Sequence, residues 1–221
     1  MTATSKAKSK VGIIGSGNVG QALATGFAKC GYKVKVGSRT PASEKLRAWA
    51  VASGKGSSTG TFAEAAAFGE ILALSTLGSA TEEAIDLAGP SNFRGKVLID
   101  TTNPLDFLNY NPPGLFLGIT DSLGERVQRK LPLANVVKCF NTVPYGQMFK
   151  PTLKDVEMLI CGNDKSAKQR VTNLLLEFGW KGAIDIGGIE GARWMEALVP
   201  LWVRTCIALK TRDVVFKALH P

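Results

Sequence analysis

The sequence contains a single histidine, His220, which is the penultimate residue. A protein without an internal histidine lacks the side chain that most often accepts the proton in dehydrogenases of alcohols and hydroxy acids, which argues against that class of enzyme. Cysteine is also sparse, and no two cysteines form a Cys-x-x-Cys pair. We therefore expect reduced, buried thiols, a cytoplasmic protein and no bound metal. The cysteines are Cys30, Cys139, Cys161 and Cys206.

Long apolar runs are absent as well. The most apolar late stretch, from Ala197 to Leu209, is too short to span a bilayer and contains Arg204. Residues 1–10 are polar and lysine-rich, so we expect a flexible basic arm rather than a secretory signal. Lys and Arg outnumber Asp and Glu by 27 to 18, but they are scattered rather than gathered in a stripe with aromatic residues. This pattern argues against a nucleic-acid partner and fits phosphorylated small molecules.

Three glycines occur at the spacing Gly-x-Gly-x-x-Gly directly after the apolar run from Val11 to Ile14. In a strand-to-helix turn, Gly15 makes the tight bend, Gly17 lets the backbone approach a pyrophosphate, and Gly20 lets the helix pack closely on the sheet. The first amides of the helix then point at the phosphates. A helical pattern and a second strand follow in order, which favours a dinucleotide site over a turn that binds nothing.

The second predicted strand, from Tyr32 to Val36, ends without the acidic residue that NAD-specific enzymes usually place there. Ser38 can donate a hydrogen bond, and Arg39 can pair with a phosphate and stack on an adenine. NADP is therefore favoured over NAD. Lys45, one turn into a helix expected to start at Thr40 and Pro41, is either a further phosphate contact or part of a solvated helix face.

The rest of the chain alternates short strands and helices. This pattern predicts an α/β fold, a Rossmann-type doubly wound sheet that is mainly parallel, in one domain from residue 11 to 221. Because ligands lie at the carboxyl ends of such strands, two strand-end segments are expected to line the nicotinamide side of the cofactor, although ordinary turn chemistry is the alternative. These segments contain Ser75, Thr76 and Leu77, and Asn103 and Pro104.

A third strand end leads into Asn141, Thr142, Val143 and Pro144. The apolar residues that follow suggest a shelf for a flat aromatic substrate, and a turn in the core would look similar. No regular structure is expected in residues 111–114. A helical segment is expected from about residue 189, and because its apolar residues exceed one face, we expect it to pack on its own domain and on a second subunit in a homodimer.

Together, these segments resemble one family, the coenzyme F420-dependent NADP oxidoreductases, whose relatives include the NADPH domain of the STEAP metalloreductases. The glycine motif is shared by many enzymes, whereas the segments at residues 36–39 and 160–164 are far more particular to this family. The matching segments are residues 15–20, 36–39, 103–104, 141–144, 160–164 and 197–201.

The resemblance implies hydride transfer between NADPH and either the deazaflavin F420 or a flavin such as FMN or FAD. Asn141 stands where the F420 enzymes have a histidine before Thr-x-Pro, and the metalloreductase branch also has an asparagine there. The resemblance implies a flavin-type pocket at residues 141–143. Because the two cofactors carry this chemistry, no catalytic side chain is assigned. The NADP contacts implied by the resemblance are Ser16, Asn18, Val19, Ser38, Arg39, Ser75, Thr76 and Leu77.

Two other functions remain open from the sequence. One is an NADPH-dependent imine reductase of the pyrroline-5-carboxylate reductase type, although such enzymes need a larger helical region than remains after the sheet. The other is a non-catalytic NADP sensor that acts on a partner through its C-terminal helix. A nicotinamide pocket that is open to a second planar ligand favours an enzyme, and a pocket closed by side chains favours the sensor.

Overall fold

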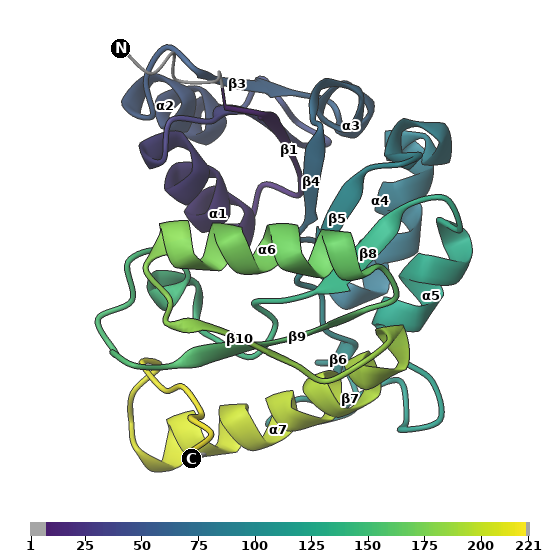
Figure 1. The fold of residues 1–221 in the computed structure, drawn as a ribbon, viewed down its shortest axis with the longest axis vertical. Helices are drawn as coiled ribbons and strands as arrows, with labels where there is room; N and C mark the ends of the chain where they lie inside the picture. Colours follow the sequence, from purple (N-terminus) through teal and green to yellow (C-terminus); the bar gives the residue numbers. More distant parts are fainter. Residues whose placement is uncertain (1–7, 220–221) are drawn as a thin grey trace.

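The computed structural model describes residues 8–219. Its centre is an eight-stranded sheet in the order β10-β9-β8-β5-β4-β1-β2-β3, parallel throughout except between β8 and β9 (Figure 1). A separate antiparallel pair joins β6 to β7. The strands are β1 (Lys10–Ile14), β2 (Lys33–Gly37), β3 (Ser57–Gly60), β4 (Ile71–Leu74), β5 (Val97–Asp100), β6 (Leu105–Asp106), β7 (Gly114–Leu115), β8 (Asn135–Lys138), β9 (Glu157–Gly162) and β10 (Gly182–Asp185).

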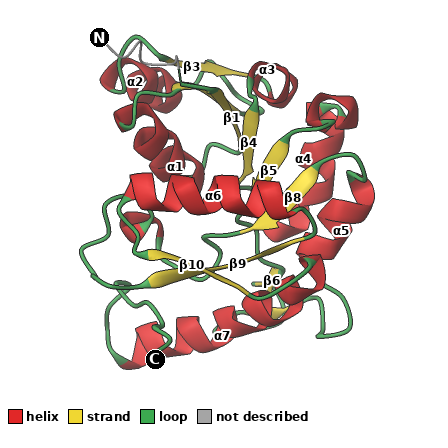
Figure 2. Cartoon of the chain, viewed as in Figure 1, coloured by secondary structure: helices red, strands yellow, loops and turns green. Residues whose placement is uncertain are grey.

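Helices cover both faces of the sheet (Figure 2). One core cluster joins α1, α2 and α6 to the sheet, and a second joins α3, α4 and α5 to the opposite face. Because both faces are covered, central strands such as β4 are buried along their whole length. The helices are α1 (Asn18–Lys29), α2 (Glu44–Ala52), α3 (Phe62–Phe68), α4 (Thr81–Ala88), α5 (Leu123–Lys130), α6 (Lys165–Phe178) and α7 (Ala192–Ala208).

The predicted fold class is confirmed. Strands β3-β2-β1-β4-β5-β8 follow the 3-2-1-4-5-6 order of a dinucleotide-binding sheet, and β9 and β10 extend it. The expected C-terminal helical segment begins with a 3-10 turn, Ile189–Gly191, and continues as α7 along the base of the molecule (Figure 1).

Two local predictions were wrong, and one strand was missed. The second helix starts at Glu44 rather than at Thr40, because the Thr40 amide donates to Ser38 Oγ at 3.1 Å and stays in the loop. Residues 111–114 are not wholly irregular, since Gly114 belongs to β7. Strand β3 was not predicted, because a run of Ser, Thr and Gly shows no apolar alternation. It is an edge strand that pairs with β2 alone.

Residues 1–7 of the predicted basic arm lie outside the described residues, and so does His220. Lys10 already opens β1, and Lys8 Nζ lies 2.6 Å from Glu177 Oε2 in an exposed ion pair. Between residues 8 and 219, no helix combines the length and apolar character needed to cross a bilayer. The same residues contain no group of three or more His, Cys, Asp or Glu side chains that could hold a metal ion.

A buried ion cluster, Asp100, Lys138 and Glu196, ties α7 to the sheet. Lys138 Nζ lies 3.0 Å from Asp100 Oδ2 and 2.6 Å from Glu196 Oε1, and all three side chains are buried. The carboxylate of Glu196 also accepts the amides of Leu123 and Gly124 at the start of α5, at 2.8 and 2.9 Å. Burial alone would lower the pKa of Lys138, but the two neighbouring carboxylates together raise it above its ordinary value. We call these three residues the buried ion cluster.

Candidate functional site

Two cavities lie at the edge of the sheet where the parallel strands end. The first, of about 650 Å³, is formed by the loops after β1, β2 and β4 and by α4, and we call it the glycine-loop cleft. Ten of the predicted cofactor residues line it. They are Gly15, Ser16, Gly17, Asn18, Val19, Ser38, Arg39, Ser75, Thr76 and Leu77.

The glycines have the geometry expected of a tight strand-to-helix turn. Gly15 has a φ of +122°, and a Cβ there would lie 2.5 Å from Ser75 O, so only glycine fits. At Gly20 a Cβ would lie 2.7 Å from Ser75 Oγ, which shows how closely α1 packs on the end of β4. At Gly17, by contrast, no atom lies within 4 Å of such a Cβ. The backbone of Gly17 therefore presents a bare surface to the cleft.

The start of α1 has no internal partner for its amides. Gly17 is the N-cap, no side chain caps the helix, and its first turn contains no acidic residue. The starts of α3, α5 and α6 are instead capped by the side chains of Thr61, Ser122 and Asp164. Free amides at the positive end of a helix dipole form an anion site, and the cleft opens onto this one.

The end of β2 carries the residues expected to select the nucleotide. Ser38 Oγ accepts hydrogen bonds from Ser16 Oγ and from the Thr40 amide, both at 3.1 Å. Arg39 is exposed and lines the cleft. Lys45 is exposed on α2 and is not among the residues that line the cleft. Of the two cations predicted to contact a 2′-phosphate, Arg39 therefore lines the cleft and Lys45 does not.

The second cavity, of about 860 Å³, lies between the ends of β5 and β8 and α7, and we call it the apolar cavity. Buried apolar side chains such as Phe140, Met148 and Val199 form its floor. Of the predicted residues, it is lined by Val19, Asn103, Asn141, Val143 and Pro144. Pro104 and Thr142 are buried and line neither this cavity nor the cleft.

A reciprocal pair of asparagines forms one polar part of the apolar cavity. Asn103 Nδ2 donates to Asn141 O, and Asn141 Nδ2 donates to Asn103 Oδ1, both at 2.9 Å. Asn141 Nδ2 also donates to Met195 O of α7 at 3.1 Å. Among the described residues, Asn141 Oδ1 is the buried side-chain polar atom that has no hydrogen-bond partner. This oxygen is itself buried, so it is an unpaired acceptor inside the protein rather than one that is open to the cavity.

The two cavities share two residues, Val19 from the first turn of α1 and Tyr145 from a 3-10 turn, Tyr145–Gln147. Tyr145 is 46% exposed. The segment from residue 141 to 144 predicted an apolar shelf here, but not that the shelf adjoins the cleft. Trp202, Lys210 and Arg212 also line the apolar cavity. No local sequence pattern predicts this, because it depends on how α7 lies against the sheet.

Comparison with known proteins agrees with this geometry. Residues 10–104 match the family described as NADP oxidoreductase, coenzyme F420-dependent. The F420-dependent NADP reductase of Methanothermobacter marburgensis is 30% identical over 92% of this chain and 95% of the relative. The rat metalloreductase STEAP3 is 31% identical over 90% of this chain. The chain spans only 39% of the length of that metalloreductase.

A crystal structure assigned as an F420-dependent NADP reductase from Arthrobacter sp. FB24 is also similar. It superposes with a TM-score of 0.92 and 36% identity, and covers 96% of this chain and 100% of that one. Identity at this level over both full lengths extends the match beyond the glycine-loop half of the fold to the apolar cavity and α7. The chain therefore belongs to the family of coenzyme F420-dependent NADP oxidoreductases.

Proposed function

We propose that the protein is an NADPH-dependent oxidoreductase that transfers hydride between NADP(H) and the deazaflavin F420 or a flavin. The observation that carries the proposal is the junction of the two cavities at Val19 and Tyr145. Hydride transfer between two planar rings requires them to be held in contact at one place. A nucleotide in the glycine-loop cleft and a ring in the apolar cavity meet at this junction.

The residues of the cleft suit NADP. The uncapped start of α1 and the bare backbone of Gly17 suit a pyrophosphate. Ser38 and Arg39 suit a 2′-phosphate, because a guanidinium forms charge-assisted bonds to phosphate and no acid stands at the end of β2. Thr76 and Leu77, which follow β4, also line the cleft.

NADPH supplies the hydride, and a proton from solvent completes the two-electron reduction of the acceptor ring. The chain itself orients the rings. Phe140 and Met148 provide an apolar floor for the acceptor. No side chain needs to act as acid or base in this scheme.

An open second cavity supports an enzyme over a sensor that only binds NADP. If side chains closed the space beyond Tyr145, a nucleotide in the cleft would have no reaction partner. The apolar cavity instead has a volume of about 860 Å³, within the range of sites that hold a small ligand.

The proposed enzyme acts as a homodimer through α7. Met195, Val199 and Cys206 are buried against the chain's own domain, whereas Trp194 is 61% and Leu201 54% exposed. These two apolar side chains are seven residues apart and so share the opposite face of the helix. Analytical ultracentrifugation of the native protein and of W194E/L201E tests this, and a native monomer would refute it.

The function is tested by following NADPH oxidation with purified protein and F420, FMN, FAD or riboflavin, with NADH as the control donor. Tyr145→Ala should lower turnover, because Tyr145 borders both cavities at the proposed junction. Tyr110→Ala is the matched control, since Tyr110 is 54% exposed and lines neither cavity. If NADPH binds but is not oxidised with any of these acceptors, the proposal is contradicted.

A further inference from the structure

The rim of the apolar cavity is built by the segment after α7, residues 209–214, which we call the C-terminal strap. The chain turns back at Lys210, whose φ is +52°, and the Thr211 amide donates to Cys206 O at 3.1 Å. Trp202 Nε1 then donates to Val214 O at 2.7 Å. The strap therefore lies against α7 and forms part of the cavity wall.

A second contact fixes the strap from the other side. Gln147, which is buried in the same 3-10 turn as Tyr145, donates from Nε2 to Asp213 Oδ1 at 3.1 Å. Its Oε1 accepts the Thr152 amide at 2.8 Å, so the Gln147 side chain is itself held in place. Bonds to Trp202 and Gln147 thus make the strap an ordered wall of the cavity.

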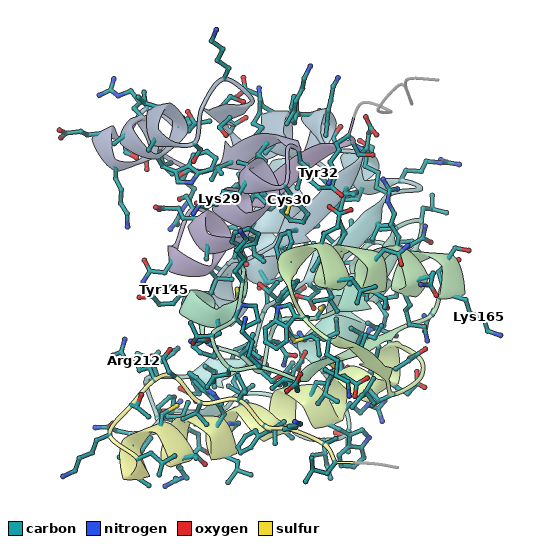
Figure 3. All side chains as sticks on the ribbon, turned by 60° about the vertical axis from the view of Figure 1, so that its left-hand side comes forward. Lys29, Cys30, Tyr32, Tyr145, Lys165 and Arg212 are labelled. Carbon is teal, nitrogen blue, oxygen red and sulfur yellow. The ribbon has the colours of Figure 1, made fainter. Side chains whose placement is uncertain are left out.

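The charged groups of the cavity gather on this strap. Lys210 and Arg212 are exposed and line the cavity, and within residues 8–219 neither side chain has an ion-pair or hydrogen-bond partner. Asp213 is the one carboxylate in the lining, and Gln147 already donates to it. Figure 3 shows Arg212 and Tyr145 on the same side of the molecule. The rim therefore carries two cations and one engaged carboxylate.

The charges on the strap act on the interior of the cavity. Burial raises the pKa of Cys206, which lines the cavity wall, while the charge of Arg212 acts to lower it and that of Asp213 to raise it. The floor around Phe140, Met148 and Val199 is apolar and buried. The cavity thus combines a buried apolar floor with exposed cations on the strap.

We propose that Lys210 and Arg212 bind the anionic tail of the acceptor, a phosphate or carboxylate joined to the ring that occupies the apolar floor. This assignment rests on the proposed function and names its substrate class. The acceptor is a ring with an acidic tail, such as FMN or F420, rather than an uncharged ring such as riboflavin. Ammonium and guanidinium groups are the side chains that best bind such tails.

The test compares ligands that share a ring and differ in the tail. FMN is compared with riboflavin, and F420 with its chromophore fragment that lacks the phosphate, by quenching of ligand fluorescence on titration with protein. The charged ligand of a pair should bind roughly tenfold more tightly, as expected for a charge-assisted contact at an exposed rim. Arg212→Gln and Lys210→Gln should each remove most of that preference without changing binding of the uncharged ligand.

Arg204→Gln is the matched control, because Arg204 is exposed on α7, does not line the cavity and contributes the same charge. The assignment is overturned if the protein binds the charged and the uncharged ligand of both pairs equally tightly. It is also overturned if Arg204→Gln weakens binding of the charged ligand as much as Arg212→Gln does. Binding is measured without NADPH, so this result is separate from turnover. A protein that prefers the charged ligand but never oxidises NADPH supports the strap assignment and contradicts the proposed function.

Discussion

Replacing Lys138 by methionine tests how α7 is held over the sheet. Lys138 Nζ donates to Asp100 Oδ2 at 3.0 Å and to Thr102 O at 2.6 Å, and it lies 2.6 Å from Glu196 Oε1. Methionine keeps the apolar stem but leaves two carboxylates buried without a cation. Breaking a buried pair in this way costs about 3–5 kcal/mol of the free energy of unfolding. The free energy of unfolding of a domain is typically about 5–15 kcal/mol, so the variant should fold but be much less stable.

The matched control is Lys130→Met, which breaks the surface pair between Lys130 Nζ and Asp86 Oδ1 at 2.8 Å. That pair is partly exposed, so its loss should cost less than about 1 kcal/mol. Urea unfolding should give a midpoint lower by about 1–2 M for Lys138→Met and a much smaller change for the control.

The pH dependence follows from the raised pKa of Lys138. The stabilisation is fully present below the ordinary lysine pKa of about 10.4 and is lost as the pH rises through the higher folded value. The stability difference between the native protein and Lys138→Met should therefore be the same at about pH 7 and about pH 9. Equal urea midpoints for Lys138→Met and Lys130→Met would refute the argument.

Three further predictions concern the cleft and the buried Tyr32. Gly17→Val should leave the thermal midpoint unchanged, since a Cβ meets no atom there, yet abolish NADPH binding measured by nucleotide fluorescence. Arg39→Ala should weaken NADPH binding about 10- to 100-fold with little effect on NADH, whereas Arg47→Ala, exposed outside the cleft, should change neither. Burial and the Glu177 charge raise the pKa of Tyr32 to about 12. The ordinary tyrosine pKa is about 10, so the stability of the protein should fall as the pH rises from 10 towards 12. Tyrosinate absorbance should show that Tyr32 in the folded protein ionises only as the pH approaches 12.

The glycine-loop half of the site could be predicted because its determinants are local. Gly15 and Gly20 act within one turn, and Ser38 and Arg39 follow directly from the end of β2. Each such residue is tied to a strand end, and parallel strands bring their carboxyl ends to one edge. The family expected from these segments and from the later motifs is confirmed by the comparisons.

The apolar cavity could be predicted only in part, because its walls come from distant segments. Asn141 was expected at a substrate pocket, but its bonds to Asn103 and to Met195 O join three elements that no local pattern connects. Lys45 was left open between a phosphate contact and a solvated helix face. It is the second residue of α2, is exposed and does not line the cleft.

The junction of the cavities and the C-terminal strap are held by the same side chain. Tyr145, which borders both cavities, lies two residues before Gln147 in one 3-10 turn. The Gln147 side chain is bonded to Thr152 on one side and to Asp213 of the strap on the other. On the strap assignment proposed above, a tail bound at the strap is linked through Gln147 to the turn that contains Tyr145. We therefore expect recognition of the acceptor's tail and orientation of its ring to depend on each other.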